Sequence, residues 1–530
     1  MDEKIHSLIR RFRENDGNIL SLLQETQEAF GYIPEEAVDI FSKELNIPAS
    51  NFYGVSTFYS QLHLNQDAVQ PVIDDHIIRG ASVAGKHSAD DKFHKKQKKV
   101  LLSACGNIDP EDIEAYRSVD GYSAIEKVLT SMTPDEVIDI IKKSGLRGRG
   151  GSGFPAGIKW EACRNAQGDQ KYIICDAYEG DPGVFKDRAV LEGNPHSVIE
   201  AMAIGAYAVG ATKGYIYLRA ENSLALQRLK KALAAAQEKG YLGTNLFNKG
   251  FDFDISIKPG AGCFVCGEET ALIESMEGHR GMSRAKPVFP VQHGLWGKPT
   301  VVNNIETLAN IPYIINKGPE WFSSIGTENS KGTKLFSLIG KVKNTGLIEV
   351  PMGITLREVI YDIGGGMEDG RRLKAVHVGG PLGSCFGESA LEMKLGYESL
   401  KKAGAIFGSG GIIVLDEDSC MVDMAKYFIA FTRSESCGKC VPCRIGTKRL
   451  FDILDRITKG SGKEDDINIL EKLGKDIKAA SLCGLGQEAP NPVLSTIEFF
   501  RDEYEAHIRD KKCPAGVCNE LPKGAETVLR

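Results

Sequence analysis

The chain has 530 residues, enough for roughly three or four domains, and its 42% hydrophobic and 26% charged residues are an ordinary globular mixture. A net charge of −6 argues against a protein that binds nucleic acid. No apolar run of about 18 residues occurs, so we expect no membrane-spanning helix. The N-terminus, MDEKIHSLIRRFREN, is charged and lacks the apolar stretch of a secretory signal, and we therefore expect a cytoplasmic protein.

Helical periodicity dominates the first part of the chain. Apolar residues recur at helical spacing in LLQETQEAFGYI and AVDIFSKEL, which predicts a helical domain over residues 1–85. Residues 86–99, KHSADDKFHKKQKK, are basic and lack apolar periodicity, so they are predicted to form a solvated linker. Order resumes with a strand-like segment, VLLSAC, at the start of the next domain.

Strands and helices then alternate. The apolar segments KYIICDA, KGYIYLR and DFDISIKP are separated by helical runs, which predicts a Rossmann-like α/β domain over residues 100–330. Two strands, a helix and a further strand over residues 333–385 predict a small α+β module, assigned to residues 331–417. A helical bundle over 418–509 and a polar tail over 510–530 complete a multidomain α/β protein.

The chain has 13 cysteines, which are not expected to form disulfides in a reducing compartment. Those that stand alone in the sequence are expected to be buried single thiols: Cys163, Cys175, Cys385 and Cys420. Cys437, Cys440 and Cys443 instead form a C-x2-C-x2-C run, which indicates an iron–sulfur cluster or zinc. A fourth thiolate must come from elsewhere, and Cys483, in the small-residue segment SLCGLG, is the downstream candidate.

A glycine-rich segment, GLRGRGGSGFPAG, spans residues 145–157. Glycines let backbone N–H groups approach a phosphate or a flat ring, and Arg147 and Arg149 add positive charge. The segment is neither the dinucleotide fingerprint between a strand and a helix nor a Walker loop, since no GK[ST] follows. By itself it is also compatible with a flexible surface loop.

More specific information comes from the order of several motifs: GLRGRGGSGFPAGIKW, FKDR, CGEETALIESMEG, GLWGKPTVVNNIETL and ESCGKCVPCRIG. Together they resemble the NADH- and FMN-binding subunit of respiratory complex I and its relatives in NAD-linked hydrogenases and formate dehydrogenases. The resemblance runs from about Lys99 to Arg509. It implies FMN, NAD(H) or NADP(H) and a [4Fe–4S] cluster as cofactors, and a β-grasp fold for residues 331–417.

The resemblance also assigns residues to each cofactor. The residues expected around the flavin are Gly148, Arg149, Gly150, Gly151, Lys159, Gly267, Glu268, Glu269, Asn303, Asn304 and Thr307. Those expected around the dinucleotide are Phe154, Glu268, Lys286 and Phe289, and the cluster ligands are Cys437, Cys440, Cys443 and Cys483. Hydride transfer is the chemistry of the cofactors, so no catalytic side chain is required, although Glu179 and Glu268 are expected to assist. An alternative role for Asn303 or Asn304 is a helix cap.

The chain departs from the family pattern in the expected cofactor site. Where relatives read C-N-A-D-E, this chain reads CDAYE, so Asp176 and Tyr178 are altered while Glu179 is kept. An aspartate in place of asparagine adds a negative charge or demands a proton near the flavin. Ala162 stands where relatives often carry an aromatic residue, and Phe264 where tyrosine is usual. NADH, NADPH or another donor therefore remain alternatives.

Both ends of the chain carry remnants of further modules. The segment from GNILSLLQ to SQLHL resembles the helical part of the family's small [2Fe–2S] subunit, yet no cysteine follows until Cys105. We infer that the cluster module has been lost and that the helices serve as a docking surface for another subunit. Near the C-terminus, His507, Cys513 and Cys518 could hold zinc with ligands from elsewhere, or carry free thiols.

The sequence thus predicts a diaphorase subunit of a larger complex such as a hydrogenase or a formate dehydrogenase. It would move a hydride between NAD(P)H and FMN and pass electrons singly to iron–sulfur partners, including a thioredoxin-like [2Fe–2S] protein, with electron bifurcation as an open question. The alternatives are a subunit that uses a non-nicotinamide donor and a non-catalytic scaffold that keeps the cluster.

Overall fold

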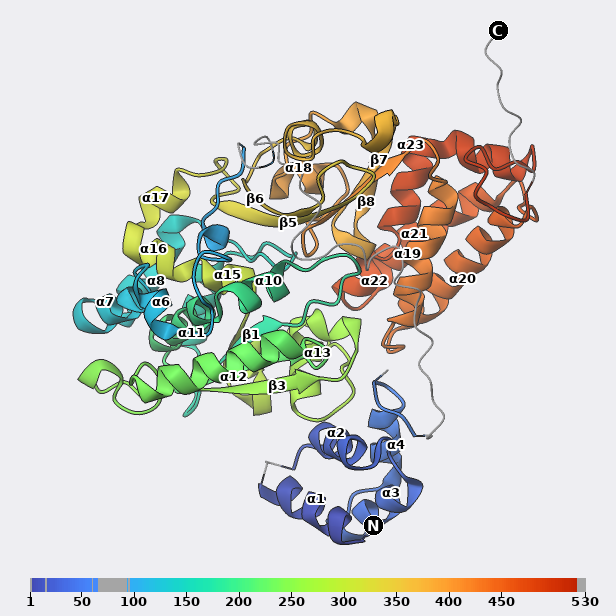
Figure 1. Ribbon diagram of the computed structural model, residues 1–530. Coiled ribbons are helices and arrows are strands. Elements are labelled where there is room, and N and C mark those ends of the chain that lie inside the picture. Colours follow the sequence, from blue (N-terminus) through green and yellow to red (C-terminus); the bar gives the residue numbers. More distant parts are fainter. Residues whose placement is uncertain (1, 15–16, 60, 65–92, 94–95, 522–530) are drawn as a thin grey trace.

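A computed structural model describes residues 2–14, 17–59, 61–64, 93 and 96–521. It begins with the helices α1 (Asp2–Glu14), α2 (Ile19–Phe30), α3 (Glu35–Leu45) and α4 (Ala49–Ser56), as the helical periodicity predicts. We call the described residues between 2 and 64 the N-terminal module. It forms a layer of its own against the rest of the protein, with α2 and α4 nearest to it (Figure 1). Among the described residues, no helix is both long and apolar enough to cross a membrane.

A parallel sheet forms the centre of the next domain. Its strands are β1 (Tyr172–Ala177), β2 (Lys213–Arg219), β3 (Asp254–Gly260) and β4 (Thr300–Asn304), in the spatial order β3-β2-β1-β4. The first three of these strands were predicted from the sequence. Further helices of this domain are α6 (Ile113–Arg117), α7 (Ser123–Ser131), α8 (Pro134–Ser144), α9 (Ala156–Asn165), α10 (Lys186–Gly193), α11 (Pro195–Val209), α12 (Ser223–Glu238), α13 (Glu269–Met276), α14 (Pro290–His293), α15 (Ile305–Ala309), α16 (Ile311–Lys317) and α17 (Pro319–Ser323).

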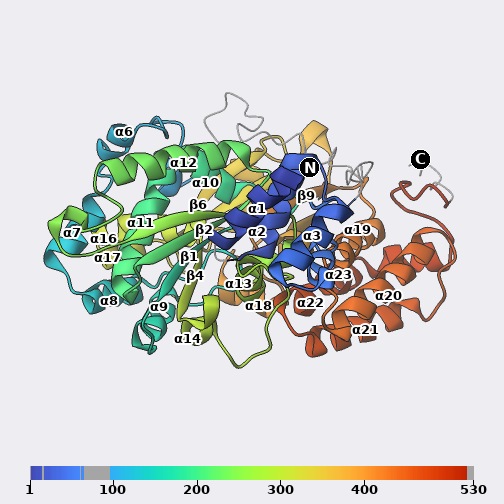
Figure 2. The same cartoon turned by 90° about the horizontal axis from the view of Figure 1, so that it is seen from below.

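Both faces of this sheet are buried, as is usual when all strands are parallel. On β1, Ile173 and Cys175 belong to the core that contains α9, α11 and α12, whereas the intervening Ile174 belongs to a second core. This second core contains residues of α13 and of the N-terminal module. Seen from below, α1, α2 and α3 lie across this side of the sheet beside α13 (Figure 2). The N-terminal module is therefore part of the packing of the parallel sheet.

A second sheet follows, in the order β6-β5-β9-β7-β8. Its strands are β5 (Thr333–Gly340), β6 (Gly346–Pro351), β7 (Leu373–Val378), β8 (Ser384–Gly387) and β9 (Gly411–Asp416), with α18 (Tyr397–Lys402) before the last strand. The central pair β5 and β9 is parallel, and the other pairs are antiparallel. The C-terminal bundle contains α19 (Met421–Ser434), α20 (Val441–Thr458), α21 (Asp466–Ala480), α22 (Gly484–Glu488) and α23 (Asn491–Ile508).

The segment before the parallel sheet differs from its predictions. Within the predicted solvated linker, Phe93 is buried in the core of the second sheet, and Lys96 pairs with Glu358 and Asp362. The predicted strand VLLSAC is instead a 3-10 turn, Leu101–Ser103. The Glu349 carboxylate on β6 accepts hydrogen bonds from the backbone N–H groups of residues 100, 101 and 102, which stabilises the turn. A long-range carboxylate thus overrides the local strand preference.

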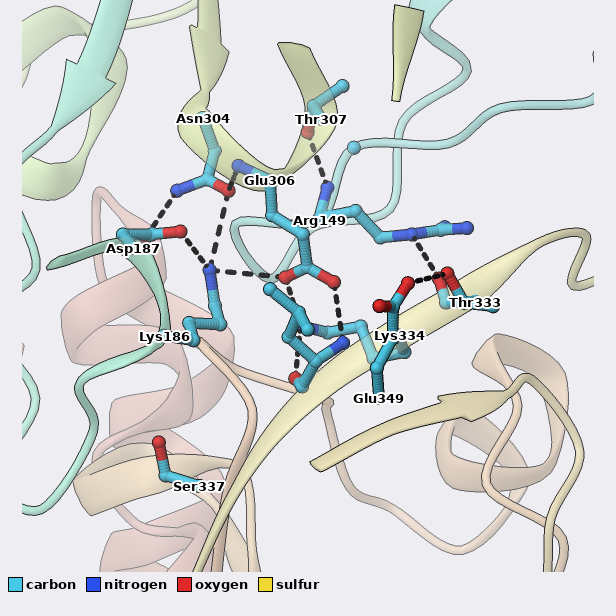
Figure 3. A network of polar contacts seen from close by, with 12 residues as sticks. Arg149, Lys186, Asp187, Asn304, Glu306, Thr307, Thr333, Lys334, Ser337 and Glu349 are labelled. Atoms are coloured by element: carbon cyan, nitrogen blue, oxygen red, sulfur yellow. Dashed lines mark hydrogen bonds and ion pairs between the residues drawn. The ribbon is translucent and has the colours of Figure 1, made fainter. Parts of the chain in front are cut away.

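A buried ionic network joins the two sheets (Figure 3). Glu306, at the start of α15, accepts from Lys334 of β5 at 2.5 Å and lies 3.2 Å from the Nζ atom of Lys186. Lys186 also contacts Asp187 at 2.6 Å, and these side chains are at most 4% exposed. Burial lowers the pKa of Lys334 to about 8, although Glu306 opposes this shift. Burial would also lower the pKa of Lys186, but the carboxylates of Asp187 and Glu306 outweigh it and raise this pKa.

We expect Glu306→Gln to lower the free energy of unfolding by about 3 kcal/mol, because it leaves buried ammonium groups without their shared carboxylate. Thermal and urea unfolding would measure the change. The matched control is Asp452→Asn, which removes the exposed partner of Lys448 and should cost less than about 0.5 kcal/mol. Equal losses in the two variants would contradict this account of the network.

Candidate functional site

The glycine-rich loop joins α8 to α9 and lies against the second sheet. It is closed by a hydrogen bond from the Gly148 N–H to the Phe154 carbonyl, at 2.8 Å. Gly153 has φ +66°, and a Cβ atom there would lie 2.4 Å from the ring of Tyr397. A Cβ atom on Gly151 would lie 3.3 Å from the carbonyl oxygen of Gly408. The loop is therefore a packed structure in which glycine permits close approach, not a flexible surface loop.

Arg149 anchors this loop through both its backbone and its side chain. Its backbone N–H donates to the Thr307 hydroxyl at 2.8 Å, and its guanidinium donates to the carbonyls of Thr333 and Lys331 and to the Tyr397 hydroxyl. The side chain is only 1% exposed. The guanidinium donors of Arg149 are thus used at the junction with the second sheet. The contribution of Arg149 to the surface of the glycine loop is therefore its main chain.

Lys159 and Glu269 bring opposite charges together beside β4. The Lys159 ammonium lies 2.5 Å from the Glu269 carboxylate and donates to the Val302 carbonyl at 2.8 Å. Neighbouring Glu268 caps α13, because its carboxylate accepts from the backbone N–H groups of Thr270 and Ala271. The CGEE turn is therefore held by its own helix, with Gly267 directly before the capping residue.

The asparagine side chains of the NNIET segment make hydrogen bonds that stabilise the fold. Asn304 caps α15 by accepting from the Glu306 N–H at 3.0 Å, and its amide donates to Asp187 at 2.7 Å. The helix-cap alternative is thereby confirmed for Asn304. Asn303 instead accepts from the indole N–H of Trp160 at 2.8 Å. Of the predicted flavin residues in this segment, Asn304 and Thr307 lie against Gly150 and Arg149 of the glycine loop.

Three acidic side chains lie at the end of β1: Asp176 within the strand, and Glu179 and Asp181 just after it. Burial raises the pKa of Asp176 to about 8, a shift that a hydrogen bond from the Tyr178 N–H opposes and that the charge of Asp187 reinforces. Burial likewise raises the pKa values of Glu179 and Asp181 to about 7. Glu179 also accepts from the first N–H groups of α10. Burial therefore favours the protonated form of Asp176, which resembles the asparagine of the family pattern.

Tyr178 does not lie with these acids. Its side chain is 6% exposed and packs beside Tyr217, and its hydroxyl accepts from the backbone N–H of Cys263 at 2.5 Å. The Arg219 guanidinium lies over its ring, 5.4 Å from the centroid. The side chain thus belongs to the core shared with the N-terminal module, although the family resemblance placed it with the cofactor residues.

Exposed aromatic rings occur on two segments near this site. Phe154 of the glycine loop is 52% exposed, and Phe289, directly before α14, is 46% exposed. The Lys286 ammonium lies 6.0 Å from the Phe289 ring centroid. Large apolar groups at such exposure are available for a flat ligand, and their stacking on a nucleotide stays a prediction.

The four predicted cluster cysteines line one cavity. Cys437 lies between α19 and α20, Cys440 is the N-cap of α20, and Cys443 is in its first turn. Cys483 is the N-cap of α22. Burial raises the pKa of Cys443 to about 11, and the nearby Cys440 and Cys483 reinforce this shift. Thiols that face one another in this way require a cationic centre before they can all ionise.

The wall of this cavity offers donors to such a centre. The Ser283 hydroxyl lines the cavity, is buried, and has no hydrogen-bond partner among the described residues. Ser436 lies 3.2 Å from the Cys443 sulfur. A Cβ atom on Gly486 would lie 3.0 Å from the Cys443 Cβ, so only glycine lets α22 approach this closely. The donor set fits a cluster bound by thiolates with hydrogen bonds to its sulfurs.

A second group of thiols lies at the far side of the C-terminal bundle. The predicted residues His507, Cys513 and Cys518 meet there, and Cys420 completes the group. The ligand atoms of these four buried residues all lie within 4.8 Å of one another. The expectation that Cys420 is a single thiol was therefore wrong, because the fold brings it to residues that lie far away in the sequence. Cys163, Cys175 and Cys385 are buried, as expected.

The raised pKa of Asp176 makes a pH-dependent contribution to the stability of the flavin-free protein. The unfolded-state pKa is about 4, so this contribution is fully present below pH 4 and is lost as the pH rises to about 8. Asp176→Asn removes the titration. We expect the melting temperature of this variant to exceed that of the wild type by an amount that grows from pH 5 to pH 8 and then levels off. Parallel melting curves across this range would contradict the assignment.

Comparisons with known proteins agree with this geometry. Four family models match the chain: thioredoxin-like [2Fe–2S] ferredoxin (residues 5–99), Nuo51 FMN-binding domain (141–313), SLBB domain (335–386) and NADH-ubiquinone oxidoreductase-F iron-sulfur binding region (423–507). The first model extends over residues 65–92, which lie outside the described part of the structure.

Relatives match over most of their length. The chain is 61% identical over 427 residues to the HndC subunit of the NADP-reducing hydrogenase of Solidesulfovibrio fructosivorans, which covers 81% of this chain and 87% of that protein. It is 45% identical over 411 residues to the F 2 subunit of the NADH-quinone oxidoreductase of Rhizobium meliloti, covering 77% and 98%. A chain in the crystal structure of an air-oxidized NAD+-reducing [NiFe]-hydrogenase is 28% identical with a TM-score of 0.75, covering 93% and 94%. The chain belongs to the family of FMN-binding NADH-quinone oxidoreductase F subunits and their hydrogenase relatives.

Proposed function

We propose that the chain is the flavoprotein subunit of a larger oxidoreductase complex, at which a nicotinamide nucleotide exchanges electrons with iron–sulfur partners. The observation that carries this function is the placement of four cysteines in one cavity of the same chain that holds the glycine loop and its neighbouring polar residues. A two-electron carrier and a one-electron centre in one protein make an electron converter. We also propose that the complex of this chain and its partners is located in the cytoplasm.

The residues that would hold FMN belong to four segments: the glycine loop with the start of α9, the end of β1, the turn before α13, and the end of β4 with α15. They are Gly148, Gly150 and Gly151 with the main chain of Arg149, Lys159, Asp176, Glu179, Gly267, Glu268, Glu269, Asn303, Asn304 and Thr307. The glycine loop presents backbone N–H groups, and Lys159 supplies a cation for a phosphate or for a reduced ring. Phe154, Lys286 and Phe289 would hold the dinucleotide.

The side chains of this site mainly position neighbouring segments and exclude water. The protonated Asp176 avoids a negative charge near the flavin, and Glu179 holds α10 by its helix N-terminus. Exposed Phe154 and Phe289 offer apolar surface that would displace water from a nucleotide ring. When bound, FMN would accept a hydride and return single electrons. The residues that would hold the accepting cluster are Cys437, Cys440, Cys443 and Cys483.

The test is an anaerobic titration of FMN- and iron-reconstituted protein with NADH and then with NADPH. We expect one nucleotide to bleach the flavin absorption and to produce the electron paramagnetic resonance signal of a reduced cluster. Cys483→Ser should keep the flavin bleaching and lose the cluster signal, whereas Cys105→Ser should keep both. A flavin that stays oxidised with both nucleotides but bleaches with dithionite would overturn the nicotinamide function and favour a different donor.

We further propose that Cys420, His507, Cys513 and Cys518 bind zinc. The Cys420 and Cys518 sulfurs are 3.8 Å apart, and each lies within 3.5 Å of the His507 Nε2 atom. A tetrahedral zinc with bonds of about 2.3 Å to sulfur requires separations of roughly 3.8 Å between its ligands. His507 Nδ1 donates to the Glu503 carbonyl at 2.6 Å, so the lone pair of the neutral imidazole is on Nε2, the atom nearest the two sulfurs.

We expect about one zinc per chain in the purified protein and loss of this zinc in Cys420→Ser, because a site with one neutral oxygen in place of a thiolate binds zinc far less tightly. Elemental analysis gives the stoichiometry, and Cys105→Ser is the matched control. The iron content should be the same in all three proteins. Wild-type protein without stoichiometric zinc would contradict the proposal.

A further inference from the structure

The N-terminal module is fixed to one continuous strip of the FMN-binding domain, residues 259–281. Gln61 donates its backbone N–H to the Ala261 carbonyl at 3.4 Å, and Asn18 donates its side-chain amide to the Met276 carbonyl at 2.7 Å. The hydroxyl of Tyr59 donates to the His279 carbonyl at 2.7 Å. In the opposite direction, the Arg280 guanidinium donates to the Gly54 carbonyl at 2.7 Å. The bonds lie near both ends of the strip, and three of these four use its backbone carbonyls.

Buried apolar side chains also pack between the N-terminal module and this strip. Phe52 is fully buried and Val55 is 5% exposed, and both belong to one core with Leu272 and Met276 of α13. The approach is close, since a Cβ atom on Gly278 would lie 3.0 Å from the backbone nitrogen of Ile19. A helical module held by buried side chains and by backbone hydrogen bonds resembles an obligate interface in its chemistry. It does not resemble a loosely tethered domain.

The N-terminal module is similar to part of a [2Fe–2S] ferredoxin. Residues 5–99 match the thioredoxin-like [2Fe–2S] ferredoxin model, yet the first cysteine of the chain is Cys105. The N-terminal segment therefore offers no thiolate to a cluster. What the structure retains is the helical part of such a protein, docked in place on the flavoprotein domain (Figure 2).

We propose that the N-terminal module occupies in cis the face on which the helices of a separate [2Fe–2S] ferredoxin partner would dock. A partner of this type therefore binds the chain through its cluster-bearing domain on another surface, and its own helices gain no site on residues 259–281. The inference rests on the proposed exchange of electrons with an iron–sulfur partner. It specifies that this chain supplies the helices of the pair and that the partner supplies the cluster.

Hydrogen–deuterium exchange of the full-length chain tests the proposal. The probe is a purified two-domain thioredoxin-like [2Fe–2S] ferredoxin with its helices and its cluster domain, added in excess. We expect residues 2–59 and 259–281 to keep the same protection with and without the probe, and new protection to appear elsewhere on the chain and on the probe's cluster domain. Deprotection of residues 2–59 together with protection of the probe's helices would overturn the proposal, as would the absence of binding.

A loosened variant provides the second arm. Asn18→Ala with Tyr59→Phe and Arg280→Ala removes side-chain bonds across the contact while leaving the apolar core in place. We expect the probe's helices to become protected only in this variant, with apparent affinity raised at least about threefold. Unchanged affinity and unprotected helices would show that the module does not compete for this face. The control is Arg357→Ala, which removes an exposed ion pair with Glu392 on the second sheet. Reduction of a viologen dye by NADH is measured separately, so failure of the proposed function is distinguished from failure of this inference.

Discussion

The buried carboxylate of Glu306 is the constraint on which the arrangement of the two sheets depends. It lies between the ammonium groups of Lys186 and Lys334, which come from the parallel sheet domain and from the second sheet. Charges of this kind are costly to bury, and they are tolerated here because each has an opposite charge or a backbone partner. The same junction holds the side chain of Arg149, so the glycine loop is positioned by the contact between the domains.

This coupling explains how a loop rich in glycine can be an ordered binding surface. Gly151 and Gly153 approach Gly408 and Tyr397 so closely that added Cβ atoms would lie only 3.3 Å and 2.4 Å from them. Thr307 then fixes the backbone of Arg149 from the opposite side. A site built from backbone N–H groups is effective only when the backbone is immobile, because its donors cannot adjust independently as side chains do.

The electrostatics of the site follow from burial in the same way. An ionised Asp176 would add a negative charge at the end of β1, but burial raises its pKa and favours the neutral acid. The departure from the family pattern at this position is therefore smaller chemically than it is in sequence. At Tyr178 the opposite holds, since an aromatic ring replaces a small acid and joins a core that the N-terminal module shares.

The sequence by itself determined the helical N-terminal module, three strands of the parallel sheet and the run of Cys437, Cys440 and Cys443, because periodicity and close spacing are local properties of the chain. Only the tertiary structure decided which distant groups meet. Cys420 joined His507 across the bundle, Phe93 entered a core from a segment that looks solvated, and Glu349 turned a strand-like segment into a helical turn. Each depends on a contact between residues far apart in sequence, and the strength of such a contact is set by burial, which no local pattern encodes.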